Sequence, residues 1–442
     1  MVVEVDDLIQ TGLFLTGEME GAGAMPEPID GYQAAGVLPS TWKTAGRGWG
    51  HPLHKLSPYV GRFPAALVRY FVLNLSDPGQ TVFDPWSGGG TTVLESALCD
   101  REAVGSDAFA YARILSRAKG DPLSYEAFDS YLRRKLDEAT HVDNTHWRLL
   151  DNEDVRVSFS DYTLDQILRL REVLRGDEGR EATFLKAVVS GVLHGPSAMF
   201  LSAPQKDQVS STTDYVRKYL RERGIVPPDR DLYASCMRKA QLSLRDPLPH
   251  RCARVFRADC RDVPLGDDSV DLVVTSPPYM SVLSYPWNNW LRLWWLGADR
   301  LTESAALMQS GREDMYRAFM RASLAELWRV MRPNSAAVIV VGDVGQKKGG
   351  VVTVVNSAQL IADEAVALGF ETDRIIDDVY GLNARSMLVQ NMLKWQYTEE
   401  DHADKSSVLT DRCLVLRKGA IGWRCPRIDW ASIKKRRMYL VS

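Results

Sequence analysis

The stretch "TSPPYM", Thr275 to Met280, follows an apolar run and combines a hydroxyl, two prolines and an aromatic ring. A proline has no N–H to donate, and its fixed φ holds its carbonyl as a rigid hydrogen-bond acceptor. The Ser276 hydroxyl can accept or donate, and Tyr279 offers a flat face for stacking. The stretch therefore fits either the end of a strand stopped by proline or a rigid platform for chemistry.

A second stretch, "DPWSGGGTT" at 84–92, has the residue types of a ligand-binding turn. Its glycines allow a sharp turn and a close approach by a ligand, and the threonines would open a helix whose free N–H groups favour an anion. Asp107 follows Gly88 by nineteen residues, near the spacing at which dinucleotide folds place an acid for the ribose hydroxyls. A Rossmann dinucleotide enzyme and a glycine turn without ligand are both open here, although the third glycine of GxGxxG is missing.

A sheet could bring these residues together, and the sequence predicts strands that alternate with helices, as a parallel sheet requires. Short apolar runs end at the glycine turn and at Asp107, and later runs lie at 254–259, 270–276, 336–343, 370–377 and 411–418, with helical patterns between them. Ligands bind beyond the carboxyl ends of such strands. The predicted fold class is therefore α/β, a Rossmann-like doubly wound sheet interrupted by a mostly helical insertion.

The same patterns divide the chain into segments. A glycine- and proline-rich arm is expected over 1–50, and the sheet domain is expected in two parts, 51–120 and 251–418. The helical insertion lies between them at 121–250, and a basic tail follows at 419–442.

The composition of the 442 residues, 45% hydrophobic and 25% charged, is that of a soluble globular protein. We see no signal peptide and no membrane span, and the six cysteines form no CxxC pair, so we expect a cytoplasmic protein without a metal site. The net charge is −3, but its distribution is uneven: residues 120–185 hold an excess of six acids, and 205–257 an excess of six bases. Such a basic face is typical of nucleic-acid contact, although a solvated helix face explains it equally well.

Together the two stretches resemble the amino-group DNA methyltransferase family, which modifies cytosine N4 or adenine N6. "FDPWSGGGTT" is similar to the family's S-adenosylmethionine loop, "TSPPY" looks like its catalytic motif, and "HKLSPYVGRFPAALVRYF" resembles the segment before the loop. The resemblance covers 51–120 and 251–418, so it implies the methyltransferase form of the doubly wound sheet. Trp86 replaces the usual Phe and Gly89 the usual Ser, and the lost hydroxyl suggests a lower affinity for the cofactor.

The resemblance implies S-adenosyl-L-methionine as cofactor and gives roles to the matching residues. Three parts of the cofactor would each meet an acid: the methionine end would meet Asp84, the ribose Asp107 and the adenine amino group Asp259. The glycines would leave room along the cofactor, the threonines would cap the helix and touch its carboxylate, and a Phe-Pro pair would line the other side. The full cofactor set is Phe63, Pro64, Asp84, Pro85, Ser87, Gly88, Gly90, Thr91, Thr92, Asp107 and Asp259.

The predicted catalytic set is Ser276, Pro277, Pro278 and Tyr279. An exocyclic amine is a weak nucleophile, and acceptors at the Pro277 carbonyl and the Ser276 hydroxyl would sharpen it while Tyr279 stacks on a flipped base. No covalent intermediate is needed, and the Pro-Cys dipeptide of cytosine-C5 enzymes is absent from the sequence. The serine favours cytosine N4, while adenine N6 in DNA, an RNA base, and a catalytically silent DNA-binding module remain alternatives.

The insertion is the candidate target-recognition region, because it is the only large segment outside the resemblance. Its stretch "DYVRKYLRERG" offers four cations for phosphates, namely Arg217, Lys218, Arg221 and Arg223. Double-stranded DNA is the expected partner, and a bacterial modification or defence setting would add a restriction or defence protein. Target sequence and oligomeric state stay open.

The aromatic stretch "SYPWNNWLRLWWLG" at 284–297 directly follows the catalytic motif. Trp290, Leu291, Trp294 and Trp295 have helical spacing, which predicts core packing. As an alternative, Tyr285 or Trp287 lines the base pocket or stacks on nucleic acid. Two histidines, His51 and His54, are interpreted as structural or surface residues, and the basic run at 434–440 as solvated.

Overall fold

The computed structural model describes residues 49–62, 64–143, 153–205, 210–280, 284–342, 344–348, 351–381, 408–419 and 438–439. Most of the predicted arm at 1–50 and of the predicted tail at 419–442 therefore lies outside the described residues.

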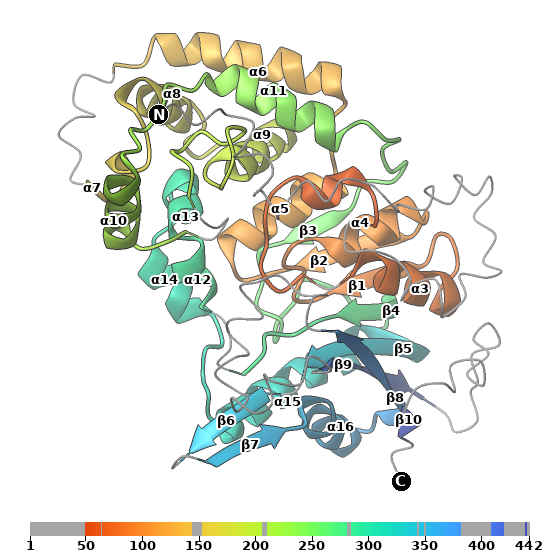
Figure 1. Cartoon of the computed structure of the whole chain (residues 1–442). Helices are drawn as coiled ribbons and strands as arrows, with labels where there is room; N and C mark the ends of the chain where they lie inside the picture. The colour runs from red at the N-terminus through yellow and green to blue at the C-terminus, as the bar shows by residue number, and fades with distance from the viewer. Residues whose placement is uncertain are drawn as a thin grey trace.

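An eight-stranded sheet forms the centre of the molecule, in the order β10-β8-β9-β5-β4-β1-β2-β3 (Figure 1). Its strands are β1 (Thr81–Asp84), β2 (Glu102–Ser106), β3 (Arg254–Phe256), β4 (Val270–Thr275), β5 (Met331–Gly342), β8 (Glu371–Gly381), β9 (Val408–Lys418) and β10 (Met438–Tyr439). The pairs from β3 through β2, β1 and β4 to β5 are parallel, while β9 is antiparallel to both β5 and β8. The predicted α/β class and doubly wound sheet are confirmed.

The strand order reverses at β1. The chain runs outward from β1 to β2 and β3, and then returns to β4 on the other side of β1. In open α/β sheets ligands bind at such a switch point, outside the carboxyl ends of the strands. The topology therefore directs attention to the ends of β1 and β4, which are Asp84 and Thr275.

Helices cover both faces of the sheet. The helices that pack on it are α3 (Ala65–Leu75), α4 (Thr91–Leu98), α5 (Ala110–Gly120), α15 (Glu313–Val330) and α16 (Ser357–Ala367). Four shorter helices, η1 (Pro52–Lys55), α12 (Tyr285–Asn288), α13 (Trp290–Leu296) and α14 (Arg300–Ala306), pack with the helical part of the chain instead. Side chains of β5 alternate between two cores: Val338 and Val340 pack with α3, while Ile339 and Val341 pack with α15 and α16. This period of two is that of a strand buried on both faces.

Between β2 and β3 the described residues form helices only. After α5 these are α6 (Tyr125–Thr140), α7 (Glu153–Arg156), α8 (Asp161–Val173), α9 (Arg180–Val192), α10 (Thr213–Arg223) and α11 (Leu232–Ser243). All of them except α10 share one apolar core with α5 and α13, and α6 and α11 lie side by side on its outer surface (Figure 1). Val216 and Leu220 of α10 pack with Ala203 in a small separate cluster. The helical character expected for 121–250 is present in this part, while the domain boundaries themselves stay a prediction.

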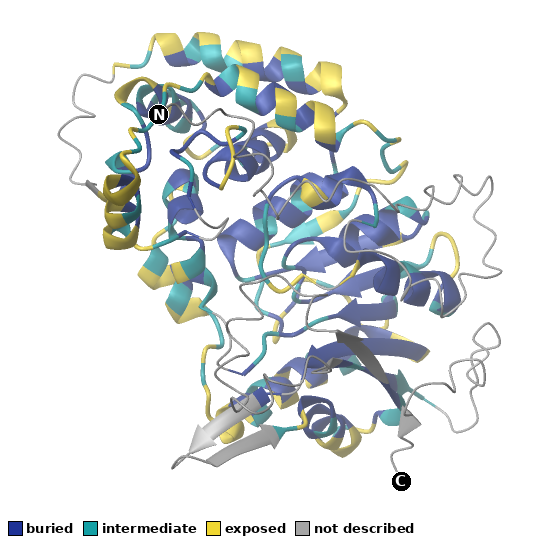
Figure 2. Ribbon diagram, in the orientation of Figure 1, coloured by how far each residue is buried: buried dark blue, intermediate teal, exposed yellow. Residues whose placement is uncertain are grey.

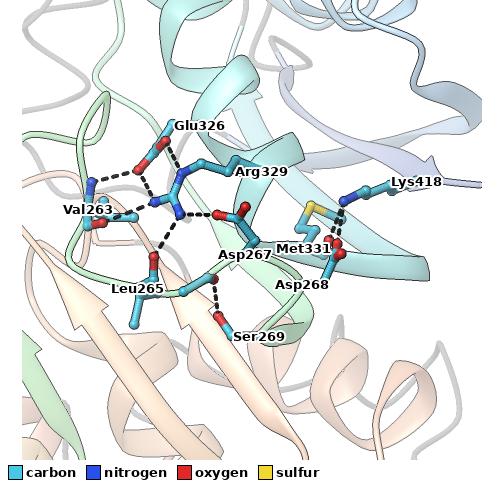
Figure 3. A network of polar contacts seen from close by, with 10 residues as sticks. Val263, Leu265, Asp267, Asp268, Ser269, Glu326, Arg329, Met331 and Lys418 are labelled. Carbon is cyan, nitrogen blue, oxygen red and sulfur yellow. Dashed lines mark hydrogen bonds and ion pairs between the residues drawn. The ribbon is translucent and has the colours of Figure 1, made fainter.

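A polar network fixes the loop that enters β4 at its amino end (Figure 3). Arg329, at the end of α15, donates to the carbonyls of Val263 and Leu265 and to the carboxylates of Asp267 and Glu326, over 2.6–3.2 Å. Glu326 in turn accepts from the Val263 N–H at 2.8 Å. Nearby, Lys418 of β9 donates to the Asp268 carboxylate at 2.6 Å and to the Met331 carbonyl at 2.7 Å. The strand that leads to the "TSPPYM" stretch is thus anchored at its start.

Two features complete the fold. The hairpin of β6 (Val344–Lys348) and β7 (Val351–Val355), with Val344 opposite Val355, lies outside the main sheet and was not expected from the sequence. None of the described helices is both long and apolar enough to cross a membrane.

Candidate active site

The carboxyl ends of β1, β2, β3 and β4 meet at one edge of the sheet and surround a pocket. Its empty volume is about 840 Å³ including the part open to solvent, which is the size of a site for a nucleoside-sized ligand. Predicted residues from all four strand ends line it, namely Pro85, Ser87, Gly88, Thr91, Asp107, Asp259, Ser276 and Pro278. Residues separated by up to two hundred positions in the sequence therefore face one cavity.

The glycine turn after β1 requires glycine at two positions for different reasons. Gly88 and Gly90 have φ of +47° and +73°, in the left-handed region that side chains disfavour. At Gly90 a Cβ would also lie 2.8 Å from the Ser116 Cα, so the turn packs directly on the α5 backbone. At Gly89 a Cβ would lie 3.3 Å from the Tyr59 Cβ. The glycine that replaces the family's usual serine thus matches a turn covered closely by Tyr59.

Asp107 connects the turn to the second strand. Its carboxylate accepts from the backbone N–H groups of Gly88 and Phe109, both at 2.9 Å. Its side chain is buried beside the pocket, and this burial raises its pKa to about 6, because the hydrogen bonds offset the desolvation only in part. The Asp107 carboxylate is therefore fixed in orientation, and its pKa is close to neutral pH.

Asp259 and Cys260 line the pocket after β3. The Asp259 carboxylate accepts from Arg261 at 2.7 and 2.9 Å, and this guanidinium lowers the pKa of the carboxyl. Burial raises the pKa of the Cys260 thiol to about 12, and the Cys260 Sγ lies 3.3 Å from the Ser323 Oγ. Such a thiol stays protonated at neutral pH, so it is a poor nucleophile.

Asp84 lies beneath the pocket and does not line it. It is fully buried, and its Oδ1 accepts from the Thr275 hydroxyl at 2.5 Å and from the Trp86 N–H at 3.2 Å. Desolvation raises the pKa of Asp84 to about 7, the larger of the two shifts among the buried acids here. Asp84 therefore ties the end of β1 to the residue that immediately precedes Ser276.

The loop after β4 reaches the pocket through two of its four predicted residues. Ser276 and Pro278 are half-buried and line the cavity, whereas Pro277 is buried and does not. Tyr279 is half-buried and packs against the core beneath α15, with its ring 3.6 Å from the place of a Cβ on Gly342. Of the double proline, only Pro278 thus forms part of the cavity wall, and Tyr279 is outside the lining.

Two pocket residues carry buried hydroxyls that have no hydrogen-bond partner among the described residues, the Ser87 Oγ and the Thr91 Oγ1. Buried polar groups without a partner cost free energy, so their hydroxyls are suited to a polar ligand. Thr92, in contrast, donates to the Val274 carbonyl at 2.9 Å and supports the fold.

Several lining residues were not predicted from the sequence. Tyr59 and Arg62 come from the segment before α3, and Leu307 and Met308 from the end of α14. Tyr285 of α12, one of the two residues given as the alternative for the base pocket, also lines the cavity, and Trp287 does not. Tyr59 and Tyr285 stack with ring centroids 5.7 Å apart. Of the predicted pair before α3, Pro64 is exposed and outside the lining, and Phe63 lies outside the described residues.

Lys119 is a further unpredicted contact of the glycine turn. Its ammonium is fully buried and donates to the carbonyls of Gly89 and His54, while Ser116, one turn earlier on α5, donates to the Gly88 carbonyl at 3.0 Å. The α5 helix therefore holds the turn from behind through two side chains on one face.

The two histidines that the sequence analysis set aside are buried and structural. The His54 Nε2 lies 2.6 Å from the Glu95 carboxylate, which also accepts from Arg69 at 2.6 Å, and His51 contacts the Pro247 carbonyl at 3.0 Å. No cluster of three His, Cys, Asp or Glu that could hold a metal ion occurs within the described ranges.

The four predicted phosphate contacts lie away from the pocket, on α10. All four side chains are exposed, and the outer face of the helix is open to solvent (Figure 2). On the helix, Arg217 is 3.8 Å from Asp214, Lys218 is 3.9 Å from Glu222, and Arg223 lies over the Tyr219 ring, 4.1 Å from its centroid. Hence α10 can offer its cations to another molecule.

Apart from Phe63 and Pro64, the predicted residues thus fall into three groups. Eight line the pocket, and Asp84, Gly90, Thr92, Pro277 and Tyr279 support or flank it. The α10 cations form a separate surface.

Comparison with known proteins gives the following matches. Residues 38–117 match a family of DNA methylases, a span that includes the glycine turn and ends before β3 and β4. No curated protein matches the chain. A candidate DNA modification methylase from Thermus thermophilus, solved with S-adenosyl-L-methionine, is 23% identical over 38% of this chain and 55% of its own, with a TM-score of 0.24. The match thus spans about half the length of that relative.

Two further solved structures cover more of the chain at lower identity. TrmN from Thermus thermophilus is 13% identical over 83% of this chain and 52% of its own, with a TM-score of 0.29. A candidate methyltransferase from Bacillus halodurans is 9% identical over 80% of this chain and 99% of its own, with a TM-score of 0.32.

Proposed function

We propose that this chain is an S-adenosylmethionine-dependent methyltransferase that modifies an exocyclic amino group of a flipped base in DNA. The observation that carries the proposal is a single pocket lined by both the glycine turn after β1 and the Ser-Pro-Pro loop after β4. The match of residues 38–117 to DNA methylases supports the choice of DNA as substrate.

The pocket fits the cofactor. Its unpartnered hydroxyls at Ser87 and Thr91 lie beside the glycine turn, whose Gly88 and Gly89 also line the pocket, and acids follow β2 and β3. Asp107 would hold the ribose and Asp259 the adenine amino group. When bound, S-adenosylmethionine supplies an activated methyl group. Asp84, which lies below the lining, would act through the loops that it connects.

The Ser-Pro-Pro-Tyr loop would position and polarise the amine. The Ser276 hydroxyl and the Pro277 carbonyl would accept hydrogen bonds from its protons, which concentrates electron density on the nitrogen. Tyr279 would stack on the base, and fixed acceptors in a partly dehydrated cavity would supply most of the rate. A covalent route is disfavoured, because Cys260 is the one cysteine among the pocket-lining residues and its pKa is raised to about 12.

Cytosine N4 is the proposed position, because a serine opens the loop where adenine-N6 enzymes more often have Asp or Asn. Adenine N6 in DNA, or an RNA base, is the nearer alternative, and the Gly89 substitution keeps a silent binding module as the farther one. The α10 cations would contact phosphates, which position DNA without reading its sequence. A cytoplasmic modification or defence system, with a restriction or defence partner, is the setting we propose.

Nucleoside mass spectrometry tests the proposal. The full chain is incubated with genomic DNA, or in parallel with total RNA, and methyl-labelled S-adenosylmethionine, and the digested nucleosides are identified. We expect N4-methylcytosine from DNA with the wild-type chain, and at least a 100-fold loss with Pro277→Ala or Tyr279→Ala while calorimetric cofactor binding persists. Detection of N6-methyladenine would reject cytosine N4 as the position, and label in RNA alone would reject DNA as the substrate. Binding of DNA without any methylated product would support the catalytically silent module.

A further inference from the structure

The aromatic stretch that follows the catalytic loop divides into two groups in the structure. Trp290 and Trp295 donate from their indole nitrogens to the carbonyls of Ser211 and Lys186, at 3.0 and 3.1 Å, and pack with Trp294 against the helical core. Trp287, on α12, is 48% exposed and belongs to no core. The first group has the packing that helical spacing predicts, and Trp287 needs another explanation.

Trp287 is held in a defined orientation although it is exposed. The Arg300 guanidinium of α14 lies over its ring, 3.7 Å from the centroid. A cation–π contact of this kind covers one face of an indole and limits its rotation. The remaining exposed surface of the ring is therefore presented to solvent as a fixed, flat apolar face.

This pair lies on the elements that also form the pocket. Tyr285, two residues before Trp287, lines the cavity, and so do Ala306 and Leu307 at the end of α14. α12 and α14 contact each other along the left of the molecule in Figure 1. An aromatic face thus stands on the same short helices as the proposed base site.

The pair is also joined to the cationic helix. The Ser210 N–H donates to the Asn288 carbonyl at 2.9 Å, and the Ser210 hydroxyl accepts from the Leu291 N–H at 3.3 Å. Three residues later α10 begins, with its exposed Arg217, Lys218 and Arg221. The loop that leads into the cationic helix α10 is therefore hydrogen-bonded to the end of α12, the helix that carries Trp287.

We propose that Trp287, supported by Arg300, stacks on a DNA base next to the target nucleotide, while α10 contacts the neighbouring phosphates. Every base has an aromatic face, so this contact stabilises unstacked DNA at the pocket and reads no sequence. The inference rests on the proposed function in that it takes DNA as the substrate. It adds the surface by which an opened strand is held.

Fluorescence anisotropy with the full chain tests this contact. The probes are a fluorescein-labelled mixed-sequence DNA strand and its duplex, titrated over a range of salt concentrations. The variants are Trp287→Ala, Trp287→Phe and, as a matched control, Leu301→Ala, which removes another exposed apolar side chain (66% exposed) from α14. Circular dichroism confirms that each variant is folded.

We expect Trp287→Ala to weaken binding of the single strand by about 5- to 100-fold, with a smaller loss on the duplex. The slope of log K against log salt stays unchanged, because no phosphate contact is lost, whereas Arg221→Gln lowers it by about 0.9. Trp287→Phe retains most of the affinity but loses the part of the tryptophan quenching by DNA that Trp287 contributes. If Trp287 had only a structural role, DNA would not quench its fluorescence, and Trp287→Phe would leave the quenching unchanged.

The inference is overturned alone if the wild type methylates DNA and Trp287→Ala binds both probes as Leu301→Ala does. A fall in the salt slope for Trp287→Ala would likewise reject stacking. If the wild-type chain binds no DNA and yields no methylated nucleoside, the proposed function and the inference fail together.

Discussion

At the amino edge of the sheet Glu326 meets a cation, whereas Asp84 and Asp107, two buried carboxylates at the carboxyl edge, do not. Glu326 lies against Arg329, and this guanidinium lowers the pKa of the carboxyl (Figure 3). Asp84 and Asp107, at the other edge, have no ion pair among the described residues, and burial raises their pKa values to about 7 and about 6. The ionised carboxylate is thus stabilised by a cation at Glu326, whereas burial raises its free energy at Asp84 and Asp107.

This difference in pKa suits the carboxyls to different roles, structural support at Glu326 and ligand binding at Asp84 and Asp107. A carboxylate paired with Arg329 stabilises the entry to β4 and has little left to offer a ligand. Acids that accept only neutral hydrogen bonds, beside unpartnered hydroxyls at Ser87 and Thr91, can gain stabilisation when a polar or cationic ligand arrives. These two acids are therefore held at a cost in stability and are better prepared than Glu326 to bind a ligand.

The largest expected effect is on the free energy of unfolding, through the buried Asp84 carboxyl. Its pKa rises from 3.8 to about 7 on folding, so the folded state holds a proton that the unfolded state has released. Stability is then greatest below pH 3.8 and falls as the pH rises through about 7. Asp84→Asn keeps the acceptor for Thr275 and should remove this loss, raising the free energy of unfolding at pH 8 by up to about 4 kcal/mol.

Urea unfolding between about pH 2.5 and pH 8 measures the effect, with Glu326→Gln as the matched control from the other edge, whose effect falls below about pH 4.5. The Glu326 pKa is lowered by folding, so that carboxyl adds stability above its unfolded pKa of 4.5 and loses it as the pH falls. The two variants should change the pH slope in opposite directions. Equal slopes would show that the two edges do not differ.

The next effect compares two glycines with left-handed φ, one at each edge. Gly90 (+73°) packs on the α5 backbone, while Gly79 (+82°), in the turn before β1, has nothing within 4 Å of the position that a Cβ would take. Gly90→Ala adds a clash to the conformational cost and should lower stability by about 3 kcal/mol and abolish cofactor binding. Gly79→Ala should cost about 1 kcal/mol and leave binding intact.

Chemical denaturation and calorimetric titration with S-adenosylmethionine measure both quantities. Intact cofactor binding by Gly90→Ala would remove the glycine turn from the proposed site. A loss of binding by Gly79→Ala as well would mean that the two edges are not independent.

The sequence was sufficient to predict all strands of the main sheet except β10, and the edge at which the proposed site lies. Apolar runs of strand length, each followed by a glycine, acid or proline, mark β1, β2 and β4, and their parallel order brings Asp107 and Ser276 to one pocket. Local pattern is enough here, because hydrophobic burial dictates the strands and topology dictates which ends meet.

Other contacts had no local signal. Asp84 is bonded to Thr275, 191 positions away, and the choice between a ligand contact and a tether depends on loop packing. Lys119 is of a type that is almost always exposed, so its burial behind the glycine turn depends on the carbonyls of Gly89 and His54. Tyr59 and Tyr285 meet only because α12 folds over the turn.

The smallest effect tests the amino edge alone, through Arg329→Met. The substitution removes the donors that fix the loop before β4 and leaves Glu326, 10% exposed, without its cation. We expect the free energy of unfolding to fall by about 2 kcal/mol, since hydrogen bonds to charged groups are lost, with cofactor affinity unchanged. Arg312→Met, which breaks an exposed pair with Asp314, is the control and should cost less than about 1 kcal/mol. A weaker cofactor affinity in Arg329→Met would mean that strain at the entry of β4 reaches its far end, and the two edges would then have to be treated as one coupled unit.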